Sequence, residues 1–145
     1  MEARKTTVEY RVPYADTDAM GVVYYANYLE YFERARNELM RATGFAYKEC
    51  EAAGVGLPVV HAECDYRESA RYDDVLEISA WVREQRGVRL EIACEVRRKI
   101  DGRLLAGGFT RHVFVDLKTF RPCPPPPAFR LSPAAPDPAA QTPAP

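Results

Sequence analysis

Two acids lie just before a long helical pattern, within residues 14–36 of this 145-residue chain. Asp16 and Asp18 stand among small residues, and Gly21 permits a tight turn that a side chain would obstruct. Asn27 is then predicted to be the N-cap of the helix. Backbone N–H groups at a helix start have no intrahelical partner, so they can polarise a carbonyl oxygen while a nearby carboxylate attacks the carbonyl carbon or activates a water. This spacing indicates acyl transfer or hydrolysis.

The same residues have a simpler interpretation. An acid before a helix commonly serves only as a cap, or as a charge that is favourable to the helix dipole. The residue types alone leave both interpretations open.

One helix and a run of strands must position these residues. Apolar residues at intervals of three or four predict a helix from Tyr28 to Thr43, ended by Gly44, and a short second helix over 45–53, stopped by Gly54. The predicted apolar stripe of the long helix consists of Leu29, Phe32, Ala35, Leu39 and Ala42. Alternation with a period of two predicts strands at 6–13, 57–68, 75–86, 88–99 and 104–117. The layout predicts an α+β fold, in which a curled antiparallel sheet of about five strands wraps around one long helix.

Composition divides the chain into one folded domain over residues 1–121 and a tail over 122–145. Ten of the twelve prolines lie in the second segment, which otherwise holds mostly alanine and polar residues. Such a segment cannot build a core, so we predict a flexible, extended tail.

Several classes of protein are disfavoured. The net charge of -1 does not indicate a nucleic-acid-binding chain. The four cysteines form no CxxC pair, and His61 and His112 are far apart, so we predict no metal site, no cofactor and two structural histidines. No signal peptide or long apolar stretch is present, so a cytoplasmic protein with free thiols and no membrane span is expected. No GxSxG motif exists from which a Ser-His-Asp triad could be built.

The stretch around Asp18 resembles the signature of the 4-hydroxybenzoyl-CoA thioesterase family of hot-dog-fold proteins, near its short-chain and Tol-Pal-associated acyl-CoA branch. The matching residues are Asp18, Ala19, Met20, Gly21, Val22, Val23, Tyr24, Tyr25, Asn27 and Tyr28. A weaker second match covers residues 69–74. Many members of the Tol-Pal-associated branch carry a histidine where this chain has Tyr25, whereas the hydroxybenzoyl-CoA enzymes carry an aromatic residue there. Any histidine-assisted step is therefore in doubt for this chain.

The resemblance implies roles for individual residues. Asp18 is expected to be the nucleophile or the general base for water, and Asp16 to be a turn or capping acid. The oxyanion donors are expected to be backbone N–H groups of Val23, Tyr24 and Tyr25. The expected substrate pocket consists of Gly21, Tyr25, Asn27 and Tyr28, although Tyr28 and Tyr31 equally suit the core or a dimer contact. Arg86 and Arg121 are expected to bind the phosphates of coenzyme A, with Arg71 and Arg89 as further candidates.

The sequence therefore predicts hydrolysis of a small acyl-CoA or aryl-CoA thioester. Alternatives are a thioesterase for acyl-carrier-protein or 1,4-dihydroxy-2-naphthoyl-CoA substrates, and a non-catalytic module that binds an acyl chain or a protein. A homo-oligomer, either a dimer or a tetramer built from dimers, is also expected, because a curled sheet leaves an edge strand to pair.

Overall fold

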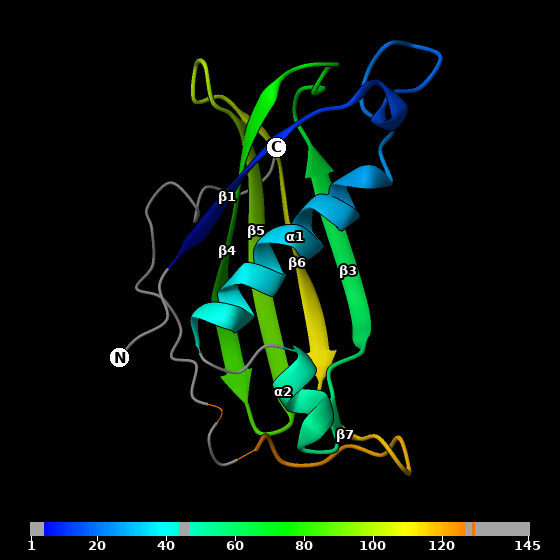
Figure 1. Ribbon diagram of the computed structural model, residues 1–145, viewed down its shortest axis with the longest axis vertical. Helices are drawn as coiled ribbons and strands as arrows, with labels where there is room; N and C mark the ends of the chain where they lie inside the picture. Colours follow the sequence, from blue (N-terminus) through cyan, green and yellow to red (C-terminus); the bar gives the residue numbers. More distant parts are fainter. Residues whose placement is uncertain (1–4, 44–46, 127–128, 130–145) are drawn as a thin grey trace.

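Five antiparallel strands curl around one long helix in the computed structural model, which describes residues 5–43, 47–126 and 129 (Figure 1). The strand order across the sheet is β1-β4-β5-β6-β3. Helix α1 spans Asn27–Ala42, and the strands span Thr6–Arg11 (β1), Val59–Tyr66 (β3), Val75–Arg86 (β4), Arg89–Arg98 (β5) and Leu104–Val113 (β6). The predicted α+β fold, with a five-stranded sheet around one helix, is confirmed.

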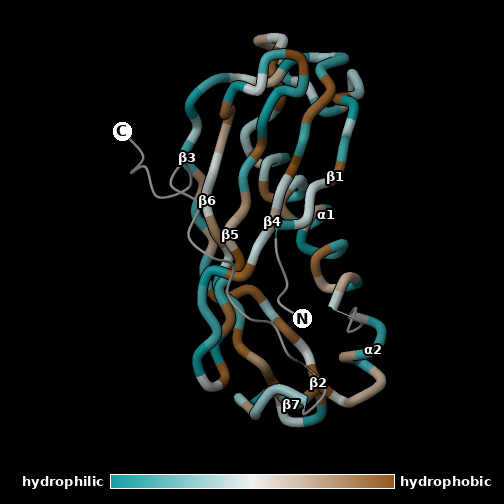
Figure 2. The backbone as a smooth tube through the Cα atoms, turned by 90° about the vertical axis from the view of Figure 1, so that its left-hand side faces the viewer, coloured by the Kyte–Doolittle hydropathy of each residue, from teal (hydrophilic) through white to brown (hydrophobic). Residues whose placement is uncertain are grey.

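Smaller elements lie at the two ends of this sheet. A 3-10 turn, η1 (Tyr14–Asp16), follows β1. At the opposite end are helix α2 (Tyr47–Ala52) and a second, two-stranded sheet made of β2 (Val55–Gly56) and β7 (Val115–Asp116) (Figures 1 and 2). The predicted start of α2 at residue 45 and the predicted helix stop at Gly44 fall outside the described residues.

The predicted alternation identifies the buried face of the two central strands. The inward residues of β4 are Leu76, Ile78, Ala80 and Val82, and those of β5 are Leu90, Ile92, Cys94 and Val96; all are buried. Helix α1 lies against this face, as the view from the side shows (Figure 2). The core is therefore the layer between α1 and the sheet.

The buried stripe of α1 is rotated relative to the predicted one. Leu29 and Ala42 were expected to be buried, but both are exposed. The buried residues of the helix are Tyr28, Tyr31, Phe32, Ala35, Arg36, Leu39 and Met40. The rotation has a physical reason: the large rings of Tyr28 and Tyr31 can fill the space between helix and sheet, with their hydroxyls reaching polar partners.

Most strands end earlier than predicted, and one is divided. The long strand predicted over 104–117 breaks at Phe114, whose buried ring enters the core and whose N–H donates to the carbonyl of Val88. The chain then pairs with a different partner, because β7 joins β2 and not the main sheet.

Two described residues beyond the predicted domain boundary at 121 contact the folded domain. The N–H of Cys123 donates to the carbonyl of Phe114 at 2.9 Å. The ring of Phe129 is 4% exposed and meets the ring of Phe114 edge to face, with centroids 4.9 Å apart. Composition did not reveal this, because one aromatic residue among prolines can still enter a core built by the rest of the chain.

Strands β3 and β6 approach closely at Gly108. A Cβ atom there would lie 1.9 Å from the carbonyl oxygen of Glu63 and 3.0 Å from the Cα of Cys64, which are backbone atoms of β3. We expect Gly108→Ala to lower the free energy of unfolding by about 3 kcal/mol, because β3 must move away.

Urea unfolding at constant pH measures this loss, and Gly107→Ala is the matched control. A Cβ at Gly107 would meet only the carbonyl oxygen of Cys94, at 3.7 Å, which is an ordinary contact. The control should stay within about 1 kcal/mol of the wild type. Equal losses in the two variants would contradict the close approach at Gly108.

His112 is a fully hydrogen-bonded core residue, as predicted. Its Nδ1–H donates to the carbonyl of Leu57 at 3.0 Å, and its Nε2 lies 2.8 Å from the hydroxyl of Thr110. The Nη1 of Arg36 donates to the same hydroxyl at 3.4 Å, which leaves the hydroxyl proton for Nε2. Burial lowers the pKa of His112 from 6.5 to about 4, and the charge of Arg36 contributes in the same direction.

This shift predicts a pH dependence of stability. Above pH 6.5 the imidazole is neutral in both states. As the pH falls from 6.5 towards 4, only the unfolded chain gains the proton, so the free energy of unfolding falls by up to about 3 kcal/mol. Urea titrations from pH 7 to pH 4 measure this slope. His112→Gln should flatten this slope by close to one proton, and an unchanged slope in that variant would contradict the assignment.

Candidate active site

The turn that carries Asp18 is a short hairpin between β1 and α1. The N–H of Asp18 donates to the carbonyl of Val22, and the N–H of Gly21 donates back to the carbonyl of Asp18, both at 2.9 Å. Thr17 and Val23 form an antiparallel bridge one residue further in. Gly21 has a φ of +78°, which confirms the predicted turn that needs a glycine.

The carboxylate of Asp18 is half-buried and only partly engaged. Its Oδ1 accepts a hydrogen bond from the N–H of Met20 at 2.8 Å. Within the described residues, Oδ2 accepts none. One oxygen therefore holds the turn, and the other is available for chemistry.

The helix start leaves fewer N–H groups free than predicted. The N–H of Val23 donates to the carbonyl of Ala70 at 2.8 Å, and that of Tyr24 donates to the carbonyl of Asp16 at 2.9 Å. These two residues were predicted as oxyanion donors, but their N–H groups are already occupied. The N–H groups of Tyr25 and Ala26 have no acceptor among the described residues. The candidate donors therefore narrow to Tyr25, with Ala26 as a group that the sequence reasoning missed.

Asn27 is not the N-cap that the sequence predicted. Ala26 occupies the cap position, and Asn27 is the first residue of α1. The side-chain Nδ2 of Asn27 donates to the carbonyl of Asp16 at 2.9 Å. This hydrogen bond ties the start of α1 to Asp16, which lies two residues before Asp18, so the amide braces the hairpin against the helix.

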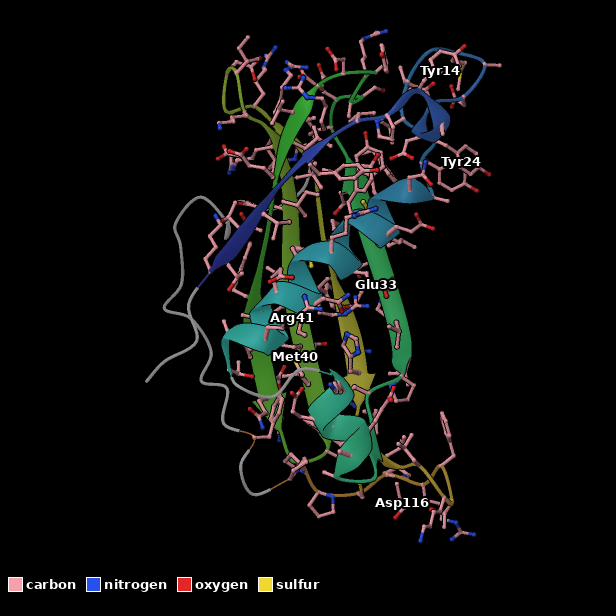
Figure 3. The ribbon with its side chains drawn as sticks, in the orientation of Figure 1. Tyr14, Tyr24, Glu33, Met40, Arg41 and Asp116 are labelled. Carbon is pink, nitrogen blue, oxygen red and sulfur yellow. The ribbon has the colours of Figure 1, made fainter. Side chains whose placement is uncertain are left out.

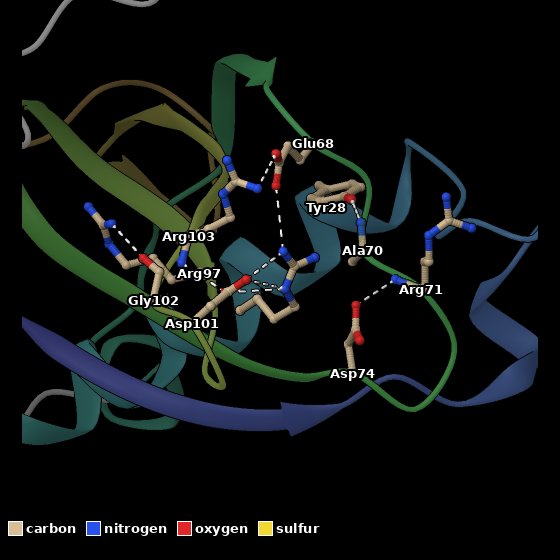
Figure 4. Close-up of polar contacts among 10 residues, drawn as sticks. Tyr28, Glu68, Ala70, Arg71, Asp74, Arg97, Asp101, Gly102 and Arg103 are labelled. Carbon is tan, nitrogen blue, oxygen red and sulfur yellow. Dashed lines mark hydrogen bonds and ion pairs between the residues drawn. The ribbon is translucent and has the colours of Figure 1, made fainter.

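Exposed aromatic rings surround the hairpin. Tyr24 and Tyr25 are 46% and 63% exposed, with ring centroids 4.9 Å apart, and Tyr24 lies at the same end of the molecule as Tyr14 (Figure 3). Tyr28 is buried instead, and its hydroxyl accepts a hydrogen bond from the N–H of Ala70 at 3.0 Å (Figure 4). Of the predicted pocket aromatics, Tyr25 is open to a ligand and Tyr28 belongs to the core beneath it.

Tyr66 is a residue that the sequence reasoning missed. Its hydroxyl donates to the carbonyl of Tyr25 at 2.9 Å, and its ring packs edge to face on Tyr25 and Tyr28. Burial, with the neighbouring Cys64, raises the pKa of Tyr66 to about 12, so the hydroxyl remains a donor at neutral pH. In the sequence, only the position of Tyr66 near the end of the predicted strand 57–68 could have indicated that it lies near the site.

The second family-like stretch lies against the first. Arg71 forms an antiparallel bridge with Val22, and Ala70 bonds to both Val23 and Tyr28. The N–H of Arg71 donates to the carboxylate of Asp74 at 2.9 Å, which closes this loop (Figure 4). Two stretches that are distant in sequence therefore build one end of the molecule together.

The sequence profile of the thioesterase-like superfamily matches residues 12–131. The chain belongs to this superfamily. Acyl-CoA thioesterase YbgC of Haemophilus influenzae is 36% identical over 113 residues, which cover 77% of this chain and 82% of that protein. The resemblance that the two stretches indicated is therefore confirmed.

Solved structures of thioesterases share the fold of this superfamily member. A 1,4-dihydroxy-2-naphthoyl-CoA thioesterase from Synechocystis is 27% identical, with a TM-score of 0.79 and 86% and 91% of the two chains covered. A DHNA-CoA thioesterase from Staphylococcus aureus is 30% identical, with a TM-score of 0.78 and 83% and 80% covered. These matches confirm the hot-dog fold.

The two predicted phosphate ligands of this thioesterase-like chain lie far from its own Asp18. The hairpin adjoins the Val75 end of β4, where Val75 pairs with Arg11, and Arg86 ends that strand eleven residues further on. At about 3.3 Å per residue, the two ends are about 36 Å apart. Arg121 is bonded to Asp116, which lies at the opposite end of the molecule from Tyr24 (Figure 3). One chain does not bring these arginines to its own Asp18.

Three of the four cysteine thiols are not poised for nucleophilic attack. Burial raises the pKa of Cys50 and Cys64 to about 11 and that of Cys94 to about 12, so these three are protonated at neutral pH. In the described ranges, no three His, Cys, Asp or Glu side chains gather as a metal site would require. Within the same ranges, no helix has the length and apolar character to cross a bilayer.

Proposed function

We propose that the chain is an acyl-CoA thioesterase that hydrolyses a small acyl-CoA or aryl-CoA thioester, with Asp18 as its catalytic carboxylate. The observation that carries the proposal is the juxtaposition at the helix start. Within the part of the chain that the structure describes, a half-buried carboxylate with one unengaged oxygen lies in a hairpin that ends beside the N–H groups of Tyr25 and Ala26, which have no acceptor there. Acyl transfer needs both features, a group that attacks or activates water and donors for the oxyanion.

The chemistry follows from these two groups. The thioester oxygen accepts a hydrogen bond from the N–H of Tyr25, which strengthens as negative charge develops on that oxygen. Asp18 either attacks the carbonyl carbon and expels the CoA thiolate, giving a mixed anhydride that water cleaves, or removes a proton from an attacking water. Both routes give the free acid and coenzyme A.

The surroundings support a small acyl or aryl group. Exposed rings of Tyr24, Tyr25 and Tyr66 stand beside the hairpin and offer stacking surfaces. Two similar solved structures are thioesterases for 1,4-dihydroxy-2-naphthoyl-CoA, which makes this aryl-CoA the second candidate substrate. Acyl-carrier-protein thioesters and a non-catalytic binding role are the remaining alternatives.

We also propose that the active form is a homo-oligomer paired through β3. This edge strand has eight residues, seven of them exposed, including Val59 and Val60. Antiparallel pairing of two copies places the Val59 end of one β3 beside the Tyr66 end of the other. The β2–β7 end of the partner therefore lies beside the end of this chain that carries the Asp18 hairpin. Arg121 of the partner subunit then approaches this chain's Asp18 hairpin, which the chain's own Arg121 cannot do.

Multi-angle light scattering at micromolar concentration tests the pairing. The wild type should have the mass of a dimer or tetramer. Val60→Lys should shift it towards the monomer, because it places a charge on the paired edge. Ile100→Lys is the control and should leave the mass unchanged, because Ile100 lies in the turn between β5 and β6 and is 90% exposed. A monomeric wild type would contradict the proposal.

A thiol-release assay tests the activity itself. The substrates run from acetyl-CoA to decanoyl-CoA, with benzoyl-CoA, 4-hydroxybenzoyl-CoA, phenylacetyl-CoA and 1,4-dihydroxy-2-naphthoyl-CoA added. Turnover that depends on Asp18 supports the proposal and ranks the acyl groups. No turnover with any of them contradicts a CoA thioesterase and directs attention to carrier-protein thioesters.

A further inference from the structure

Asp16 makes more hydrogen bonds than a turn or capping acid requires. Its carboxylate Oδ2 accepts from the hydroxyls of Tyr10 and Tyr31, both at 2.8 Å. Its carbonyl accepts from the N–H of Tyr24 and from the side chain of Asn27, both at 2.9 Å. Four donors from β1, from α1 and from the segment before the helix therefore converge on one residue.

The carboxylate of Asp16 does not cap a helix. Neither of its side-chain bonds goes to a backbone N–H, and the 3-10 turn that contains it has no side-chain cap. Its partners are instead two tyrosines that pack on each other, with centroids 5.1 Å apart, and Tyr31 is 1% exposed. Of the two roles predicted for Asp16, its position in a turn is therefore observed, whereas its carboxylate caps no helix.

The backbone of Asp16 joins the two halves of the proposed site. Asp18 follows two residues later in the same side of the hairpin. Tyr24, whose N–H bonds to the Asp16 carbonyl, is followed directly by Tyr25, which supplies the unpaired N–H. A displacement of Asp16 therefore changes the distance between the carboxylate of Asp18 and the oxyanion donor.

We propose that Asp16 is a positioning residue, whose carboxylate, clamped by Tyr10 and Tyr31, sets the distance between Asp18 and the N–H of Tyr25. The inference rests on the proposed function, because it assigns Asp16 a role in the reaction of Asp18. Asp16 itself touches neither substrate nor reacting atoms. Of the two clamping residues, Tyr31 is buried in the core and Tyr10 is partly buried and packs against it, so the position of Asp16 is fixed by the packing of β1 on α1.

Asp16→Asn is the decisive variant. Asparagine keeps the shape and one acceptor oxygen for the two hydroxyls, but it removes the negative charge that makes both bonds strong. The hairpin should remain folded with a looser clamp. Small misplacements of catalytic groups reduce rates by up to about 100-fold, so we expect kcat to fall about 10-fold or more. KM should change less than about threefold, because the binding surface is retained.

Asp73→Asn is the matched control for the loss of one carboxylate. Asp73 lies at the same end of the molecule and is exposed, and among the described residues its carboxylate pairs only with Arg11. Its φ of +68° is one that asparagine adopts readily. Its kcat and KM should equal those of the wild type. Tyr10→Phe and Tyr31→Phe each remove one donor of the clamp and should lower kcat in the same direction as Asp16→Asn.

The background of Asp18→Asn separates positioning from stability. If Asp16 acts through Asp18, adding Asp16→Asn to Asp18→Asn should change the residual rate less than about twofold. If Asp16 only stabilises the fold, its variant lowers the melting temperature while kcat per folded enzyme stays at the wild-type value, and the proposal is overturned. Wild-type turnover by Asp18→Asn would refute the proposed function. Wild-type kcat in Asp16→Asn alone would overturn only the positioning role of Asp16.

Discussion

Asp18→Asn should lower kcat on the best CoA thioester by about 1,000-fold while leaving the fold intact. The hairpin survives the change, because asparagine offers the same oxygen to the N–H of Met20. What disappears is the negative charge on the second oxygen, which nucleophilic attack and proton abstraction both require. Loss of a general base or nucleophile costs between about 100- and 10,000-fold.

The measurement is thiol release by purified variants of equal melting temperature. Asp18→Glu keeps the charge but moves it by one methylene, so a loss of about 10- to 100-fold is expected from misplacement alone. Asp73→Asn should retain full activity at the same assay pH. Wild-type kcat in Asp18→Asn would exclude this residue from the reaction, whatever the substrate.

Deleting residues 124–145 should destabilise the protein strongly, in contrast to what a flexible tail would predict. The deletion removes Phe129, whose ring is buried against Phe114 in the core. Removing a buried phenylalanine costs about 3–5 kcal/mol, because it forfeits the buried area and leaves a cavity. For a chain of this size, that corresponds to a fall in Tm of roughly 10 °C.

Two further variants test whether Phe129 accounts for the loss of stability. A truncation after residue 131 keeps Phe129 and the whole segment that the superfamily profile matches, so its Tm should equal that of the full chain. Phe129→Ala in the full chain should reproduce most of the loss caused by the longer deletion. A full-length Tm in the chain that ends at residue 123 would show that Phe129 contributes little to the core.

The strands and the turn that position the site could be predicted from the sequence. The alternation in β4 and β5 predicted their buried faces, because a strand directs successive side chains to opposite sides whatever its neighbours are. The requirement for glycine at position 21 was also local, since a positive φ disfavours other residues. Asp18 was identified by spacing and resemblance, and its assignment as the catalytic residue remains a proposal.

The partners of individual groups depended on the tertiary structure. Val23 and Tyr24 looked like free donors until the segment around Ala70 and the carbonyl of Asp16 took up their N–H groups. Asp16 looked like a cap until Tyr10 and Tyr31 converged on its carboxylate from two elements. Arg86 was predicted to bind the phosphates of coenzyme A, but the length of β4 places it at the other end of the sheet from the Asp18 hairpin.

The chain by itself therefore determined its family, its fold class and the turn that carries Asp18, since these depend on local geometry and on patterns along the chain. Only the tertiary structure decided which N–H groups remain free, which acid is clamped and which rings are open to a ligand. The physical reason is that hydrogen-bond saturation and burial are set by segments distant in sequence, which no local pattern specifies.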